Sequence, residues 1–579
     1  MSSKYALQKL GQRLKKYRVM LAISIILSLV FVVATLYVPK IIGDATDHII
    51  GKGKVEFKEV TKTAIIILVV VILACLVQWI MGVINNKITY NLIRDIRQET
   101  FCKIQTLPIS YIDRHSKGEL ISKIITDVDQ LADGLLMGFT SFFSGIMTIL
   151  LTLVFMVLIN WKVALVVIVL TPLSIVIARF VAKHTYDMFR KQSKVRAEQT
   201  AIIEETVKGA KLVKAFSREE SQLEKFDETN ERLEKCYTKA TFYSSLTNPT
   251  TRFVNNLIYA GVAVCGGLVC VATGVAGPNA EITVGSLMAI LTYATQYMKP
   301  FNEISGVITE LQNALASAGR VFELIDEEVN IKDDGKIVLE NPDGQVSVEH
   351  LYFSYEYKNR NQNPEEDEVR EEPKKILNDV NLEVQPGETI AIVGETGAGK
   401  TTFVNLLMRF YELDSGSIKI DGVDITDMTR EGLRASFGMV LQDTWVRNAS
   451  IRDNIKFAKP DASDEEMIKA CKECHAHNFI SKLPDGYDTI VAEDGENLSQ
   501  GQKQLLCIAR LMLDLPPMLI LDEATSSIDT RTEMRIQRAF EKMMNGRTTF
   551  IVAHRLSTIQ NADKVLEMKD GTLKVKEGV

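Results

Sequence analysis

The sequence contains one glycine-rich stretch whose residue types and spacing suit the binding of phosphate groups. GETGAGKTT, residues 394–402, satisfies the pattern G-x-x-x-x-G-K-[ST]. In such a loop the glycines let backbone N–H groups close on phosphate oxygens, and the start of the following helix adds its dipole. Lys400 is placed to reach the β and γ phosphates, and the Thr401 hydroxyl is placed to ligate Mg²⁺. The stretch therefore predicts a site for a nucleoside triphosphate with magnesium.

Apolar segments on both sides place this loop between a strand and a helix. Residues 389–393 (TIAIV) form a short apolar run that is typical of a buried strand, and residues 403–410 (FVNLLMRF) have helical spacing. The pattern requires this order, because the start of the helix faces the bound phosphates. The context strengthens the prediction of a phosphate-binding loop.

Two adjacent carboxylates end a second apolar run, MLILDE at residues 518–523. The carboxyl ends of parallel strands meet at one edge of a sheet, so Asp522 is placed to hold Mg²⁺ there. Glu523 is then placed to orient or deprotonate an attacking water. The alternative is an acidic strand end that is only solvated. The upstream loop favours the first interpretation, hydrolysis of a nucleoside triphosphate.

Six long apolar stretches set the N-terminal half apart from the charged, glycine-punctuated C-terminal half. The chain has 579 residues, too many for one soluble core. The first stretch is uncharged over about 21 residues, roughly 30 Å as a helix, which is enough to cross a bilayer. It is too long for a signal peptide and lacks a small-residue cleavage site, so we expect a retained span. The six stretches are residues 19–39, 64–82, 135–161, 163–178, 253–280 and 282–298.

The distribution of basic residues predicts how these stretches are oriented. The amphipathic leader (residues 9–18) and the loops after the second and fourth stretches are richer in Lys and Arg than the other loops. Cytoplasmic loops carry such an excess, so we expect these segments, both chain termini and the C-terminal domain in the cytoplasm. The two basic loops are long and have charged helical patterns, which predicts helices that continue the membrane spans.

Composition argues against several other classes of partner and site. The formal net charge is −6 and the pI is about 5.9, so no nucleic-acid partner is expected. The eight Cys are scattered and predict reduced thiols rather than disulfides. Residues 471–477 (CKECHAH) contain C-x-x-C-H, for which haem attachment and zinc ligation remain minor alternatives.

Four motifs, in this order and spacing, resemble the nucleotide-binding domain of ATP-binding cassette (ABC) transporters. They are GETGAGKTT (394–402), LSQGQ (498–502), LILDEATSSID (519–529) and IVAHRLST (551–558). With the six stretches before them, the chain resembles a half-transporter of the multidrug-exporter type, and residues 110–131 and 204–220 resemble its two intracellular loops. The resemblance implies an all-α transmembrane domain of six helices with long cytoplasmic extensions at residues 1–325. An α/β P-loop NTPase domain with a helical subdomain is implied at residues 326–579.

The resemblance also implies roles for individual residues around ATP and Mg²⁺. Tyr355 is implied to stack on adenine, Gln442 to contact Mg²⁺, and His554 to contact the γ-phosphate. Asp529 is implied to couple the two ATP sites of a dimer. The residues implied to bind ATP within the chain are Tyr355, Gly394, Thr396, Gly397, Ala398, Gly399, Lys400, Thr401, Thr402 and Gln442. The implied metal ligands are Thr401, Gln442 and Asp522, and the implied catalytic residues are Glu523 and His554.

The polar turn ENLSQGQ, residues 496–502, is implied to serve a second subunit. In this family two nucleotide-binding domains pack head to tail, and each LSGGQ-type turn covers the ATP that the other domain holds. Ser499, Gly501 and Gln502 are therefore implied to bind ATP in trans, at a helix start.

Gln500 stands where the common form of this turn has glycine. It is either tolerated variation or a side chain that crowds the approach to phosphate, so that the turn closes a weakened ATP site. With Glu523 and His554 intact, the chain resembles the catalytically intact half of heterodimeric bacterial exporters. A second ABC half-transporter subunit is thus the implied partner, with a heterodimer favoured and a homodimer possible.

The implied function is ATP-driven export of a hydrophobic or amphipathic substrate, such as a drug, lipid or peptide, across the bacterial cytoplasmic membrane. Membrane lipid is an implied partner. The alternatives are a homodimeric exporter or lipid flippase, and a non-transporting membrane ATPase that regulates a channel or another protein. Tyr293, Gln296, Tyr297 and Met298 either line a substrate cavity or pack against neighbouring spans. Residues 356–375 form an acidic insertion that is expected to be a solvated loop.

Overall fold

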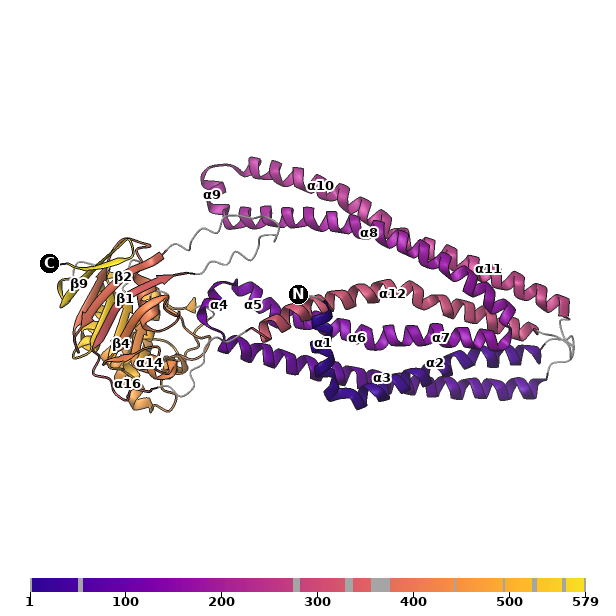
Figure 1. Cartoon of the computed structure of the whole chain (residues 1–579), viewed down its shortest axis with the longest axis horizontal. Coiled ribbons are helices and arrows are strands. Elements are labelled where there is room, and N and C mark those ends of the chain that lie inside the picture. Colours follow the sequence, from indigo (N-terminus) through magenta and orange to yellow (C-terminus); the bar gives the residue numbers. More distant parts are fainter. Residues whose placement is uncertain are drawn as a thin grey trace. The chain divides into compact units, whose positions relative to one another are not determined.

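The computed structural model divides the chain into two compact units (Figure 1). One unit comprises residues 1–105 and 117–327, and the other comprises residues 106–116 and 328–579. The acidic insertion lies outside the described part except for Lys375. The described residues exclude 1–2, 50–55, 274–281, 328–336, 356–374, 442–443, 493–494, 523–527, 554–558 and 577–579, together with the side chains of 173–175, 177–187, 247–248, 302 and 304–305.

The first unit is built from helices, several of them long. α3 has 50 residues and α8 has 48, so both exceed the thickness of a bilayer, as predicted from the basic loops that follow the apolar stretches. α9 joins the ends of α8 and α10, which lie side by side (Figure 1). The helices are α1 (Ser3–Leu14), α2 (Arg18–Asp47), α3 (Phe57–Thr106), α5 (Lys117–Ile124), α6 (Thr126–Met137), α7 (Phe143–Ile159), α8 (Trp161–Lys208), α9 (Ala210–Ala215), α10 (Glu219–Ser245), α11 (Thr247–Thr273) and α12 (Val284–Ile325).

Among the described residues of this unit, four helical segments are long and apolar enough to cross a membrane by length and composition. They are Lys4–Asp47, Phe57–Thr106, Lys117–Ile159 and Glu219–Thr273. The predicted stretch 163–178 falls in α8, whose described apolar part covers Trp161–Pro172, and the stretch 282–298 falls at the start of α12. The predicted stretch 253–280 runs beyond the described end of α11, because residues 274–280 lie outside the described part.

Side chains from α2, α7, α8, α11 and α12 form the core of the membrane region. Tyr293 is fully buried, and its hydroxyl donates to a backbone carbonyl oxygen of α2 at 2.6 Å. Tyr297 and Met298 belong to the same core, so these residues pack against neighbouring helices. α2 and α12 also approach closely at two glycines, because a Cβ on Gly285 would lie 1.9 Å from the carbonyl oxygen of Gly43.

The described residues of the second unit form two β-sheets. The larger has the order β10-β9-β3-β8-β7-β6, with parallel pairs except between β10 and β9, and the smaller is antiparallel with the order β2-β1-β4-β5. The strands are β1 (Val346–Ser354), β2 (Lys375–Val384), β3 (Thr389–Val393), β4 (Ser415–Ile420), β5 (Val423–Asp424), β6 (Phe437–Val440), β7 (Met518–Asp522), β8 (Thr548–Val552), β9 (Lys564–Lys569) and β10 (Thr572–Val575). The helices are α4 (Ile109–Asp113), α13 (Lys400–Leu407), α14 (Arg430–Ala435), α15 (Ile451–Ile455), α16 (Asp464–Glu473), α17 (His477–Ile480), α18 (Gln500–Leu513) and α19 (Thr530–Met544).

The parallel strands of the larger sheet are buried on both faces. All five residues of β8 are buried, and so are the first four of β7. Strands covered on both faces are apolar throughout rather than alternating, which is why residues 389–393 and 518–522 read as continuous apolar runs. These elements confirm the predicted fold class of a helical N-terminal region followed by an α/β domain.

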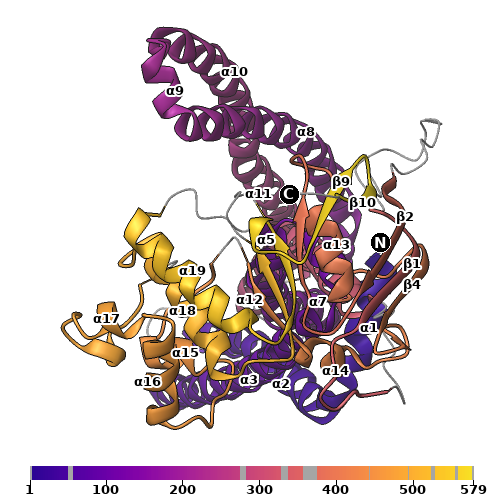
Figure 2. The same ribbon diagram turned by 90° about the vertical axis from the view of Figure 1, so that its left-hand side faces the viewer.

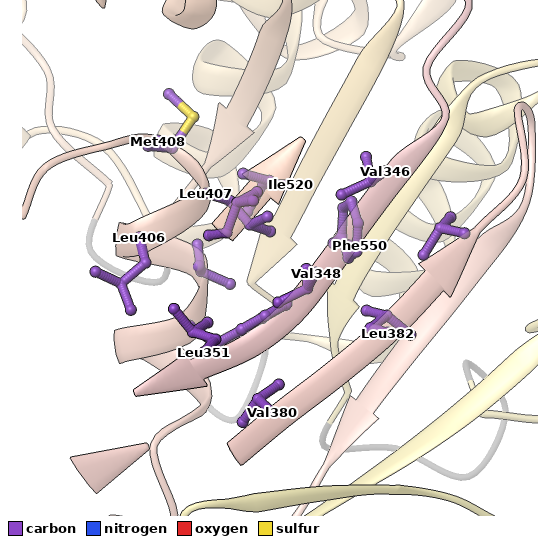
Figure 3. Close-up of a cluster of buried hydrophobic side chains, with 14 of the residues drawn as sticks. Val346, Val348, Leu351, Val380, Leu382, Leu406, Leu407, Met408, Ile520 and Phe550 are labelled. Atoms are coloured by element: carbon purple, nitrogen blue, oxygen red, sulfur yellow. The ribbon is translucent and has the colours of Figure 1, made fainter. Parts of the chain in front are cut away.

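One core of the second unit fixes α13 between the two sheets (Figure 3). Buried side chains of β1 and β2 pack in one cluster with those of α13, β7 and β8. The labelled members are Val346, Val348, Leu351, Val380, Leu382, Leu406, Leu407, Met408, Ile520 and Phe550. Because α13 is held along its length, its first turn has a fixed place at the end of the phosphate loop.

A second core holds the helical part of this unit together. α15, α16, α17 and α18 gather beside α19, on the side of the unit away from β1 and β2 (Figure 2). Met467 and Cys471 of α16, Leu505 of α18 and Ile536 of α19 are buried in this core. This group of helices is the predicted helical subdomain, and it positions the start of α18.

Candidate ATP-binding and signature sites

The loop between β3 and α13 needs glycine at specific positions. Gly394, Gly397 and Gly399 have φ angles of +153°, +86° and +107°, which L side chains rarely adopt. A Cβ on Gly394 would lie 2.3 Å from the carbonyl oxygen of Met568, in the neighbouring strand β9. The glycines of the predicted phosphate loop are therefore required by its backbone path as well as by a ligand.

Lys400 is the first residue of α13, and its side chain is folded back over the loop. Its Nζ donates to the carbonyl oxygens of Gly394 and Glu395, at 2.7 and 3.0 Å, and the side chain is buried. Among the described residues, no side chain caps the start of α13 at Gly399. The amide groups at the helix start and the lysine ammonium thus surround the loop, which suits a polyanionic ligand.

The two threonines after Lys400 face different surroundings. Thr401 is exposed, so its hydroxyl is accessible beside the loop, whereas Thr402 is buried. The hydroxyls of Tyr355 and Thr402 lie 3.2 Å apart, within hydrogen-bonding distance. This contact ties Tyr355, the residue implied to stack on adenine, to the first turn of α13.

Asp522 ends β7 at the same edge of the sheet as the phosphate loop. In the register of the strands Asp522 lies level with Val552 of β8, and Val552 lies level with Ile392 of β3. Two strand spacings, about 10 Å, separate β7 from β3. An exposed Thr401 hydroxyl and a carboxylate at this edge are oxygen donors of the kind that Mg²⁺ prefers, so the residues present fit a magnesium ion bound with nucleotide.

Three of the predicted site residues lie outside the described part of the chain. They are Gln442, Glu523 and His554. Their neighbours locate the segments: Asp522 ends β7 immediately before Glu523, and β8 ends at Val552, two residues before His554.

The signature turn, residues 496–502, leads into α18, and its Ser499 and Gln502 form a reciprocal cap at the helix start. The Gln502 amide donates to the Ser499 hydroxyl at 3.3 Å, and the Ser499 amide donates to the Gln502 side chain at 2.8 Å. Gly501 is buried, and a Cβ there would lie 2.6 Å from Cγ2 of Thr532, near the start of α19. The side-chain amide of Gln500 donates to the Thr444 hydroxyl at 3.3 Å.

The structure thus groups the predicted residues into two sets on different elements. The loop residues 394–402, Tyr355 and Asp522 lie around the edge formed by β3 and β7, whereas residues 499–502 start α18 in the helical subdomain. Gln500 therefore contacts Thr444, which follows Gln442 in the chain, and not the phosphate loop at residues 394–402.

The sequence patterns did not indicate two residues of the site region, Tyr411 and Asp113. Tyr411 packs edge to face against Tyr355, with ring centroids 5.2 Å apart, and its hydroxyl donates to Asp113 of α4. Burial, reinforced by this hydrogen bond, raises the pKa of the Tyr411 phenol above its usual value, so it stays a neutral donor. The only sequence signal was an aromatic pair just after α13, Phe410 and Tyr411.

The C-x-x-C segment is part of the helical core. Cys471 and Cys474 are buried free thiols, and burial raises their pKa values to about 11 and about 12. Both are therefore protonated at neutral pH and act as apolar packing groups there.

Comparisons with known proteins give the family. Residues 21–301 match the ABC transporter transmembrane region, and residues 377–526 match the ABC transporter family. The chain is 39% identical over 523 residues to a fatty acid ABC transporter ATP-binding/permease protein of Mycobacterium tuberculosis, covering 90% of this chain and 79% of that protein. It is 33% identical over 583 residues to an ATP-dependent lipid A-core flippase of Desulfotalea psychrophila, covering 100% and 97% of the two chains.

A solved structure of a bacterial Atm1-family ABC exporter with ATP bound shares the fold. Its TM-score against this chain is 0.74 at 26% sequence identity, and the match covers 97% of this chain and 94% of that one. The matched segments include both the apolar helices and the ATP-binding domain. The chain therefore belongs to the ABC transporters, as an integral membrane half-transporter of the exporter type that binds ATP, works as a dimer and couples ATP hydrolysis to transport.

Proposed function

We propose that this chain exports a lipid-like substrate, a fatty acid or another amphipathic molecule with an acyl chain, from the cytoplasm by alternating access. The observation that carries the proposal is that one chain combines long apolar helices with a phosphate loop whose lysine is already placed over it. The matched fatty acid transporter and lipid A-core flippase support a lipid-like substrate. The ATP-binding domain and both termini lie in the cytoplasm of a bacterium, where ATP is present.

The ATP site is assigned to residues of one subunit and completed by the other. Lys400 and the amides of residues 394–402 hold the phosphates, and Tyr355 contacts the adenine. Thr401, Gln442 and Asp522 hold Mg²⁺, which when bound neutralises charge on the β and γ phosphate oxygens. Glu523 activates the attacking water, and His554 contacts the γ-phosphate.

The second subunit supplies the signature turn that covers this ATP, and we propose that it is a different chain. Gln500 replaces the usual glycine of the turn, while Glu523 and His554 are intact. This chain therefore completes the hydrolysing site with the partner's turn, and its own turn covers a slower site. The tip around α9 supports a partner, since Leu212 and Phe216 are 64% and 71% exposed.

Transport is tested by reconstituting the chain in vesicles, alone and with any subunit that co-purifies from its native membrane. We expect ATP-dependent movement of a fluorescent fatty acid or phospholipid analogue, lost in the Glu523→Gln variant. ATP hydrolysis without movement of fatty acid, phospholipid, peptide or drug probes would support a regulatory ATPase instead. Full ATP turnover by a stable dimer of this chain alone would contradict the heterodimer and leave a homodimeric exporter.

A further inference from the structure

A short helix from the connection between α3 and α5 packs within the second unit. α4 (Ile109–Asp113) begins after Pro108, whose extended backbone separates it from α3. Tyr111 at its centre is buried, and its ring stacks on His115 with centroids 4.2 Å apart. Nδ1 of His115 also lies 2.8 Å from the Tyr111 carbonyl oxygen. The segment is therefore a compact turn that presents its last residue, Asp113, in a fixed position.

Asp113 contacts the aromatic cluster that contains Tyr355. The Tyr411 hydroxyl donates a hydrogen bond to the Asp113 carboxylate, although the two residues are 298 positions apart in the chain. The rings of Tyr411 and Tyr355 meet edge to face at 5.2 Å between centroids. Phe353 meets the same two rings, with centroids 5.8 and 4.9 Å away. Direct contacts thus run from α4 through Tyr411 to Tyr355.

The same chain of contacts reaches the phosphate loop. The Tyr355 hydroxyl lies 3.2 Å from that of Thr402, which adjoins Thr401 in the first turn of α13. Tyr355 is only half-buried, so part of its ring is accessible to a ligand. The ring meets Phe353 and Tyr411 edge to face, and its hydroxyl contacts Thr402. A shift of Tyr411 therefore changes the ring face that Tyr355 offers.

We propose that Tyr411 is a positioning residue for ATP, which links α4 to the adenine side of the site through Tyr355. The inference rests on the proposed adenine contact of Tyr355. Because coupling between two sites is reciprocal, the position of α4 changes the affinity for ATP, and bound ATP changes the position that α4 prefers. α4 lies directly between α3 and α5 in the chain. The connection between these two helices therefore responds to the adenine base of ATP as well as to its phosphates.

A simpler interpretation is that Asp113 and Tyr411 only dock α4 on the domain. The two interpretations differ in whether the effect depends on the base. A link through Tyr355 changes the affinity for ATP and leaves the affinity for tripolyphosphate, which lacks adenine, unchanged. A general distortion of α13 through Thr402 lowers the affinity for ATP and the affinity for tripolyphosphate equally.

The test measures magnesium-ATP and magnesium-tripolyphosphate affinities by calorimetry on the full chain in lipid nanodiscs. Tyr411→Phe removes only the hydroxyl, and Asp113→Ala removes its acceptor. Each is expected to weaken ATP binding about threefold to tenfold, with tripolyphosphate unchanged within about twofold and the kcat for ATP nearly unchanged while KM rises. Asp113→Asn keeps an acceptor oxygen and should restore affinity. Asp414→Ala is the matched control, because Asp414 accepts the Ser354 hydroxyl at 2.6 Å beside Tyr355 and, among the described residues, forms no hydrogen bond to α4.

A double-mutant cycle with Tyr355→Ala decides the outcome. In the Tyr355→Ala background, Asp113→Ala should cause no further loss, because the contact it acts through is gone. If the affinity losses of the two substitutions multiplied, or if affinity for ATP and for tripolyphosphate fell equally, the link would be overturned while the adenine contact stayed in place. If Tyr355→Ala alone left ATP affinity unchanged, the proposed role of Tyr355 itself would fail, which is a separate and distinguishable result.

Discussion

The starts of α13 and α18 differ in how their backbone amides are satisfied. α13 follows Gly399 and, within the described residues, has no side-chain cap, while Lys400 bonds carbonyl oxygens of the loop. α18 follows Ser499, which forms a reciprocal cap with Gln502. The first four amides of a helix have no partner inside it, so one start remains available to a ligand and the other provides its own partners.

This difference indicates which of the two helix starts can bind phosphate within a single subunit. The start of α13 lies at the end of the phosphate loop beside the Lys400 ammonium, so it is suited to hold ATP in a single subunit. The start of α18 is already satisfied in part, and an anion there must be brought close by a second surface. The comparison agrees with the proposal that residues 499–502 act only on the ATP of another subunit.

The largest expected effect is on the chemical step, in a variant that leaves both helix starts unchanged. Glu523→Gln should lower ATP turnover by about 10²-fold to 10⁴-fold, because it removes the proposed general base. ATP affinity should stay within about threefold of the parent, since neither helix start is altered, and the dimer should remain closed on ATP. Phosphate-release assays and nucleotide binding measure the two quantities. Glu541→Gln, an exposed change on α19, is the control, and near-normal hydrolysis in Glu523→Gln would assign the base elsewhere.

The next effect tests the open helix start directly. Lys400→Ala should weaken ATP binding to this chain about 10-fold to 100-fold, because it removes a charged hydrogen bond donor to the phosphates. Lys503→Ala, in the first turn of α18, should leave the affinity of a single subunit unchanged. Calorimetry on the isolated chain compares the two. Equal losses would mean that both helix starts contact the same nucleotide, which would break the comparison.

Much of this site could be predicted because its signals are local in the sequence. The spacing of the glycines and Lys400, the run before Asp522 and the polar turn before α18 each specify one element and its end. The Gln500 contact could not be predicted, because Thr444 is brought to it by folding of the helical subdomain.

The residue that α4 contacts could not be predicted for a similar reason, although residues 110–131 resemble an intracellular loop of the exporters. The two inner connections were expected to continue the membrane spans as helices, and α3 does so up to Thr106. Pro108 then ends the helical path, since proline disfavours helix at the residue before it, and residues 106–116 pack in the second unit. Asp113 and Tyr411 meet across 298 positions, a pairing that no local pattern indicates.

A smaller effect tests the capped helix start. Ser499→Ala removes the hydroxyl that caps Gln502, which should cost about 1 kcal/mol of stability and lower Tm by a few degrees. Ser499→Asn keeps a capping oxygen and should restore Tm. ATP affinity of the single chain should be unchanged in both variants. If Ser499→Ala weakened ATP binding to the isolated chain, the turn would be acting within its own domain, against the two-subunit proposal.

The smallest effect concerns α19, whose start is capped by a charged group instead of a hydroxyl. The Asp529 carboxylate accepts from the Thr532 amide at 3.0 Å, and this hydrogen bond lowers the pKa of Asp529 below its usual value. A lowered folded pKa means that the cap stabilises the fold above the unfolded value, about 4, and that this contribution is lost as the pH falls through the folded pKa. Asp529→Asn keeps an acceptor that does not titrate. The Tm difference between the parent and Asp529→Asn should therefore shrink between pH 6 and pH 3, whereas the difference between the parent and Ser499→Asn should stay constant. A constant Asp529→Asn difference would show that the charge of this cap adds nothing beyond its hydrogen bond, which would make the α18 and α19 starts equivalent.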